Sequence, residues 1–175
     1  RKTEDRISLS ITGENEISDE ASTALASIRR QIKERQNAIK DKLTEMIRSP
    51  RYQKFIQEPI VTMRNDRYVI PVKQEYRGEI KGLVHDTSSS GATLFIEPIA
   101  AVSANNEIKQ LKIKEQLEIE RILAELTSDV AAITPRLFSN MSILAKLDFI
   151  FAKAKLSQEY DCVCPDINNH GKIYI

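Results

Sequence analysis

The sequence contains no tryptophan, and aromatic residues make up only 6% of its 175 positions. Alanine, isoleucine, leucine, lysine and glutamate are abundant instead, a composition typical of long surface helices more than of a compact β-sandwich. Hydrophobic residues account for 41% and charged residues for 29%, which is the ordinary balance of a folded protein. We therefore expect one domain or one extended module that is ordered over most of its length.

Cysteine is scarce, with only Cys162 and Cys164 in the whole chain. One residue separates them, which is too few for an easy disulfide, and no second pair or histidine cluster is present to complete a zinc site. We expect both side chains to be small apolar members of a buried strand. The sequence thus predicts no metal site in this chain.

Long apolar runs are also missing, since none approaches the roughly 20 residues that cross a membrane. The charged start, RKTEDR, does not resemble a signal peptide. These features predict a cytoplasmic protein with no membrane partner. The net charge of +1 gives no overall signal for nucleic acid.

Charge is nevertheless unevenly distributed along the chain. Residues 1–20 carry three basic and six acidic residues, for a net charge of −3. Residues 21–47 carry six and three, and residues 48–86 carry eight and five, so each of these segments has a net charge of +3. The basic excess suits backbone contact with a polyanion, but charge alone favours the simpler interpretation of a solvated surface.

The common catalytic motifs are absent. The chain has no G-x-x-x-x-G-K-[ST] phosphate-binding loop and no G-x-S-x-G nucleophile elbow. His85 and Asp86 are consecutive in a predicted strand, so their side chains should point to opposite faces and cannot form a base and its orienting acid. We predict no catalytic residue in this chain.

Two long helical patterns flank the middle of the sequence. The first begins at Ser18 or Asp19, keeps a heptad register for about thirty residues, which corresponds to roughly 45 Å, and stops at Ser49-Pro50. Before it, alternation over residues 6–11 predicts a short strand, followed by a turn through Asn15.

The second helical pattern begins at Glu97-Pro98 and should be broken at Thr134-Pro135. A third helix is expected from there to about Gln158. Residues 160–167 and 172–175 look like extended segments that lead towards a further domain.

Between the long helices, two strand pairs are predicted. Residues 60–64 and 67–72 flank Asn65-Asp66, a two-residue turn whose side chains tolerate positive φ. Pro71 removes a hydrogen-bond donor, so the second strand should lie at an edge or end there. A further pair over residues 80–85 and 92–96 encloses a loop rich in serine. The expected fold is mainly α with a small antiparallel β insert, in the α+β class.

Two polar segments allow two interpretations each. The loop Ser88-Ser89-Ser90-Gly91 favours a structural turn, and its alternative is contact with a phosphate oxygen. Asn105-Asn106, within a helical pattern, could make a polar contact to the β insert, although a solvent-facing pair near the helix start is slightly favoured.

Several stretches together resemble the type II MutS paralogues of bacteria. The main ones are RYVIPVK at residues 67–73, GLVHDTSSSGATLFIEP at residues 82–98 and NNE at residues 105–107. Supporting stretches are DEAS at residues 19–22 and EIERIL at residues 118–123. The similarity extends over most of the chain.

The resemblance implies a middle region with two lever helices, near residues 18–48 and 99–133, that carry a clamp-like element. The corresponding divisions are 1–58 (core entry strand and first lever), 59–97 (β clamp), 98–134 (second lever) and 135–175 (core helix and extended segment). The family's ATPase, with its ATP and magnesium, and its C-terminal nuclease-type Smr domain have no counterpart in these residues. The resemblance implies no cofactor in this chain and a homodimeric full-length protein.

Two hypotheses of function follow from different classes. In the first, the β insert is a nucleic-acid clamp for DNA or ribosomal RNA, acting in recombination suppression or ribosome rescue, and the levers pass nucleotide state to it. The residues expected to meet phosphates are Arg64, Arg67, Lys73, Arg77 and Lys81. In the second, the region is a scaffold for dimerisation or ribosome docking that makes no direct contact with nucleic acid.

Overall fold

The computed structural model describes residues 2–164 and 167–171. Its fold is mainly α with small antiparallel sheets, the α+β class expected from the sequence. The chain divides into two compact units, one ending at Leu126 and the other beginning at Thr127. The elements are α1 (Lys2–Ser10), β1 (Ile11–Gly13), β2 (Glu16–Ile17), η1 (Asp19–Ala21), α2 (Thr23–Arg48), α3 (Pro50–Gln53), β3 (Thr62–Arg64), β4 (Arg67–Lys73), η2 (Gln74–Tyr76), β5 (Gly82–Thr87), β6 (Thr93–Pro98) and α4 (Ile99–Glu159).

The start of the chain differs from its prediction. Residues 6–11 were expected to form a strand, but α1 covers most of them, and the short hairpin β1–β2 follows. Alternation of three apolar residues is a weak signal, because Ile7 and Ile11 are also one helical turn apart. Ile7 packs against a buried cluster that contains Leu25, Ile122 and Leu126, and this tertiary contact favours the helix.

The first long helix, α2, is confirmed, but its predicted start at Ser18 or Asp19 is wrong: those residues cap and begin the separate 3-10 helix η1, Ser22 is extended, and α2 starts at Thr23. The Ser22 hydroxyl caps it by accepting a hydrogen bond from the Leu25 amide, while Ser18 caps the preceding η1. Pro50 begins α3 directly afterwards, as the Ser49-Pro50 signal predicted. The apolar stripe of α2 is buried along its length at Leu25, Ile32, Ile39, Leu43 and Ile47.

A four-stranded antiparallel sheet lies at one end of α2, with strand order β3-β4-β6-β5. The predicted turn between β3 and β4 is confirmed, because Asn65 and Asp66 have φ values of 51° and 61°. The β5–β6 pair is also confirmed. Buried residues of β4 and β6 share a core with Ile39, Leu43 and Ile47 of α2 and with the first turns of α4.

Pro71 lies inside β4, so the prediction that this strand is an edge or ends at the proline is wrong. β4 pairs with β3 through residues 67–69 and with β6 through residues 70–73. The Pro71 carbonyl accepts a hydrogen bond from the Gln57 amide, so Pro71 faces the irregular segment before β3. The amide proton that Pro71 lacks would therefore point away from β6, so its absence costs no hydrogen bond between β4 and β6.

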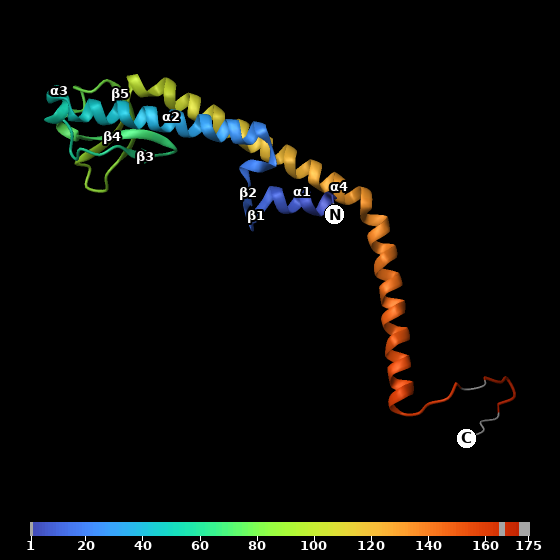
Figure 1. Cartoon of the computed structure of the whole chain (residues 1–175). Coiled ribbons are helices and arrows are strands. Elements are labelled where there is room, and N and C mark those ends of the chain that lie inside the picture. Colours follow the sequence, from blue (N-terminus) through green and yellow to red (C-terminus); the bar gives the residue numbers. More distant parts are fainter. Residues whose placement is uncertain (1, 165–166, 172–175) are drawn as a thin grey trace. The chain divides into compact units, whose positions relative to one another are not determined.

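The helix α2 and the first part of α4 form an antiparallel pair beside the sheet (Figure 1). Their cross-contacts run in opposite directions along the two sequences. From one end to the other they join Ser22 to Glu118, Arg29 to Glu115, Arg35 to Glu107 and Lys42 to the Ala100 carbonyl. Since α2 has 26 residues and a helix rises about 1.5 Å per residue, α2 is about 39 Å long.

Helix α4 begins at Ile99, because Glu97 and Pro98 still belong to β6. The expected break at Thr134-Pro135 is wrong, since α4 continues through Pro135 to Glu159. An internal proline removes one backbone hydrogen bond and crowds the carbonyl four residues before it, which can kink a helix without ending it. The Thr134 hydroxyl donates to the Val130 carbonyl next to this position.

After α4, the chain makes a turn at residues 160–161 and is irregular to residue 164. Cys162 and Cys164 are both exposed, so their assignment to a buried strand is wrong. The extended segment expected at residues 172–175 lies outside the described residues. Within the second unit, α4 exposes large apolar side chains, including Phe138, Met141, Phe149 and Phe151.

Candidate nucleic-acid interface

A buried carboxylate lies at the point where the sheet passes into α4. Glu97 is fully inaccessible to solvent and receives hydrogen bonds from three directions. Arg67 Nη1 lies 2.8 Å from Oε1 and 3.1 Å from Oε2, and Asn105 Nδ2 donates to Oε1 at 2.7 Å. His85 Nε2 is 2.6 Å from Oε2. We call Arg67, His85, Glu97 and Asn105 the Glu97 cluster.

The surroundings of Glu97 act on its pKa in opposite directions. Burial raises the pKa, whereas the hydrogen bonds from Asn105, His85 and Arg67 lower it, and the net effect is a lowered pKa. The carboxylate is therefore ionised at neutral pH. It ties β4, β5 and the first turns of α4 together through one acceptor group.

The two asparagines of α4 have different roles. Asn105 is buried and bonded to the backbone of Tyr68, so the prediction of a solvent-facing pair is wrong for it. Asn106 is exposed, but its Oδ1 accepts from Arg67 Nη2 at 2.7 Å. The polar contact to the β insert, the less favoured interpretation, is what forms.

His85 occupies the extra position of a β-bulge, because Val84 pairs with Ile96 and Asp86 pairs with Phe95. The bulge lets His85 reach Glu97 while Asp86 forms an ion pair with Arg64 at 3.2 Å. The two consecutive side chains thus serve separate partners, and they do not form a catalytic pair. Sequence reasoning missed the Glu97 cluster, although all its residues fall in the motifs that carried the family resemblance.

Two of the five predicted phosphate-binding cations have structural partners. Arg67 belongs to the Glu97 cluster, and its side chain is only 21% exposed. Arg64 lies over the ring of Phe95, with its guanidinium carbon 4.0 Å from the ring centroid, and it also pairs with Asp86. Both arginines therefore contribute to the sheet itself.

Of the other three predicted cations, Lys73 and Lys81 lie near the end of α2, and Arg77 follows η2. Lys73 Nζ donates to the Lys54 carbonyl at 3.4 Å. Arg77, after η2, and Lys81, before β5, are exposed, and neither has a carboxylate partner among the described residues. These three side chains remain candidates for phosphate contact.

The same end of the first unit carries further unpaired cations that the sequence-based prediction did not include. Arg48 ends α2 and Arg51 lies in α3, and neither guanidinium has a carboxylate partner in the described part of the chain. The remaining arginines of α2 are paired: Arg29 with Asp19 and Glu115, Arg30 with Glu34 at 3.9 Å, and Arg35 with Glu107 at 3.4 Å. Unneutralised arginine thus gathers where α2 meets the sheet.

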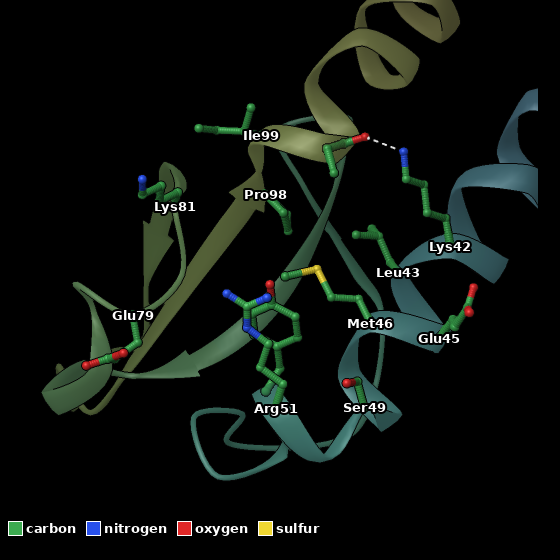
Figure 2. A pocket seen from close by; sticks show the side chains of 12 residues that line it. Lys42, Leu43, Glu45, Met46, Ser49, Arg51, Glu79, Lys81, Pro98 and Ile99 are labelled. Carbon is green, nitrogen blue, oxygen red and sulfur yellow. Dashed lines mark hydrogen bonds between the residues drawn. The ribbon is translucent and has the colours of Figure 1, made fainter.

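A groove of about 580 Å³ opens at this end, between α2, α3, the segment before β5 and the start of α4 (Figure 2). Its cations are Lys42, Arg51 and Lys81, and its carboxylates are Glu45 and Glu79. Of the predicted phosphate-binding residues, only Lys81 lines it. We call this the junction groove.

The serine-rich loop connects β5 to β6 and bonds mainly to its own backbone. The Gly91 amide donates to the Ser88 carbonyl at 2.8 Å, and the Ser88 hydroxyl accepts from the Thr93 amide at 3.1 Å. Gly91 has a φ of 75°, which favours glycine. These bonds account for the turn, and phosphate contact by Ser88, Ser89, Ser90 or Gly91 stays a prediction.

Among residues 2–164 and 167–171, no three metal-binding side chains come close enough together to hold an ion. In the same part of the chain, no helix is both long enough and apolar enough to cross a membrane.

The chain is similar in sequence to several bacterial proteins. It is 64% identical over 175 residues to the endonuclease MutS2 of Ruminiclostridium cellulolyticum and 65% identical over 175 residues to that of Acetivibrio thermocellus. It is 55% identical over 172 residues to the endonuclease MutS2 of Alkaliphilus oremlandii. The matches cover 98–100% of this chain and 22% of each relative.

This chain belongs to the MutS2 family. The resemblance inferred from its motifs is thereby confirmed. No family model matches the sequence. The chain spans about a fifth of the length of the MutS2 relatives, and the matched region extends over all its residues.

Proposed function

We propose that this chain is the lever and clamp region of a longer MutS2 protein, and that its cation-rich end contacts the phosphate backbone of nucleic acid. One observation carries the proposal. Arg48, Arg51, Arg77 and Lys81 have no carboxylate partner among the described residues, whereas the other arginines of α2 are paired. Cations that are not already neutralised can pair with phosphates without breaking an internal ion pair.

In this proposal the antiparallel pair of α2 and α4 holds the sheet at a distance from the rest of the protein. The family resemblance supplies the remainder: an ATPase that uses ATP and magnesium, a nuclease-type Smr domain, a homodimer and a cytoplasmic location. The helix pair then passes nucleotide state to the sheet. The partner is branched or duplex DNA in recombination suppression, or ribosomal RNA in ribosome rescue.

The test removes the unpaired charge from the full-length protein. Replacing Arg48, Arg51, Arg77 and Lys81 by glutamine should weaken nucleic-acid binding and lower the salt slope by up to about one unit for each lost phosphate contact. Fluorescence anisotropy against salt concentration measures both quantities. A matched variant neutralises four exposed cations elsewhere, Arg30, Lys33, Lys114 and Lys155. Equal binding and slopes for both variants and the parent would reject the proposal.

A scaffold is the second candidate function, and a separate observation favours it. In the second unit, α4 exposes Phe138 to 71%, Met141 to 67% and Phe151 to 69%. An apolar surface of this kind commonly marks a protein–protein contact. Phe138→Ser and Phe151→Ser should shift the full-length protein from dimer to monomer in light scattering. A parent protein that is monomeric at high concentration would contradict this function.

A further inference from the structure

The junction groove combines apolar walls with cations at its rim. Leu43 and Met46 of α2, together with Pro98, provide the apolar surface. Arg51 projects between α2 and the β strands beside Met46 (Figure 2). Its guanidinium carbon lies 5.3 Å from the ring centroid of the half-buried Tyr52. A volume of about 580 Å³ is typical of a site for one small molecule.

We propose that the junction groove binds a single unpaired nucleotide of a nucleic-acid strand, with its base against Arg51 and the two phosphates that flank it held by Lys42 on one side and Lys81 on the other. The proposal rests on the proposed nucleic-acid function and makes it more specific. Planar guanidinium groups and aromatic rings stack on the faces of bases. Those faces are covered by neighbouring bases in a duplex, so the groove selects a base that has left the stack.

The charges of the groove suit the two phosphates that flank one nucleotide. Lys42 Nζ donates one proton to the Ala100 carbonyl at 3.0 Å, which leaves two for another acceptor. The Lys81 ammonium and the Arg51 guanidinium have no carboxylate partner among the described residues. All three cations come from different elements, and they line one groove only when α2, α3 and the segment before β5 are assembled, with Lys42 and Lys81 on opposite sides (Figure 2).

The two carboxylates limit what else can enter. Glu45 lies on α2, and Glu79 lies on the opposite side of the groove, the same side as Lys81 (Figure 2). With three cations and two carboxylates the lining has a net charge of +1, which opposes a continuous track of phosphates. A carboxylate oxygen can instead accept a hydrogen bond from the exocyclic amino group of a base or from a ribose hydroxyl.

The experiment compares two substrates at one salt concentration, using the full-length protein and fluorescence anisotropy. One is a DNA duplex, and the other is the same duplex with a five-nucleotide single-stranded gap. The parent protein should bind the gapped DNA about 5-fold or more tightly. Arg51→Lys keeps the charge but removes the planar group, so it should abolish this preference for gapped DNA. Arg30→Lys, an exposed arginine of α2 outside the groove, is the matched control and should keep the preference.

RNA versions of both substrates form a second arm. A larger preference for gapped RNA than for gapped DNA supports a contact to the ribose hydroxyl, and equal preferences support recognition of the base and phosphate alone. A parent protein that binds gapped and intact duplexes equally, or an Arg51→Lys variant that keeps the preference, overturns the inference while leaving the proposed function intact. Failure to bind any of these nucleic acids overturns both.

Discussion

The side chain of Asn105 makes the two backbone hydrogen bonds to Tyr68 that a neighbouring strand would otherwise make. Its Oδ1 accepts from the Tyr68 amide at 3.0 Å, and its Nδ2 donates to the Tyr68 carbonyl at 3.1 Å. In the β4–β6 register, Ile70 pairs with Ile96, so Tyr68 would next meet Pro98, which has no amide proton. Asn105 of α4 thus completes the hydrogen bonding of β4 at the position where Pro98 of β6 cannot donate.

We predict that Asn105→Ala lowers the free energy of unfolding by about 2–4 kcal/mol. The substitution removes the hydrogen bonds that Asn105 makes to the buried amide and carbonyl of Tyr68 and to one oxygen of Glu97. Chemical denaturation followed by circular dichroism measures the change. Asn106→Ala is the control and should cost less than about 1 kcal/mol, since Asn106 is exposed and makes one bond, to Arg67. Equal losses for both variants would contradict the role given to Asn105.

Glu97 predicts a dependence of stability on pH. Its pKa is lowered in the folded state from the ordinary value of 4.5, so the unfolded chain binds the proton more tightly. The stabilisation is complete above pH 4.5 and is lost as the pH falls through the folded-state pKa. Glu97→Gln should lower stability at pH 7 by about 2 kcal/mol or more, through the lost ion pair with Arg67, and flatten this acid limb. Denaturation midpoints from pH 7 to pH 3 test it, and an unchanged slope in Glu97→Gln would refute it.

Ser22 has two simultaneous roles that a substitution can separate. Its hydroxyl oxygen accepts from the Leu25 amide at 2.9 Å and its proton goes to Glu118 at 2.6 Å, which joins α2 to α4. Hydrogen bonds from Arg121 and then Ser22 lower the pKa of Glu118 to about 2. Ser22→Ala should cost about 1–2 kcal/mol in thermal or chemical unfolding. Ser22→Thr keeps the hydroxyl and should recover most of that loss; no recovery would mean that the hydroxyl is not responsible.

Gly82 is required by a close approach of two strands. A Cβ built at this position would lie 2.2 Å from the Glu97 carbonyl oxygen and 2.7 Å from a side-chain carbon of Ile96. The backbone of β6 would have to move, so Gly82→Ala should destabilise the protein by about 1–3 kcal/mol. Gly78→Ala is the control, because nothing lies within 4 Å of its Cβ position. Comparable unfolding midpoints for the two variants would contradict the prediction and show that the backbone of β6 can move at little cost in stability.

Much of the fold follows from local sequence signals. The heptad of α2, the Ser49-Pro50 boundary and the Asn65-Asp66 turn each depend on residues close in sequence. The errors occur where distant contacts decide. The segment around Ile7 is helical because it packs against Leu25 and residues of α4 that lie more than a hundred positions away.

The candidate site was harder to predict for a related reason. A sequence shows which residues are basic, but it does not show which of them already have a carboxylate partner. Arg67 and Arg64 are basic residues of the β insert, yet Glu97 and Asp86 neutralise them across the sheet. Arg51 lies in a short segment between helix and hairpin that carries no sequence motif, and only the assembled groove reveals its position.

The two long helices are joined to the sheet in unlike ways. β6 becomes α4 at Pro98-Ile99 without an intervening residue, and the Glu97 cluster fastens the corner. Between Arg48, the last residue of α2, and Thr62, the first of β3, lie α3 and an irregular segment. The connection from β6 to α4 is therefore direct, whereas the segment between α2 and β3 is held along β4 by backbone hydrogen bonds of Phe55 and Gln57. The sheet is thus linked to α4 through its own chain, and to α2 through side-chain packing and hydrogen bonds that can break without breaking the covalent path.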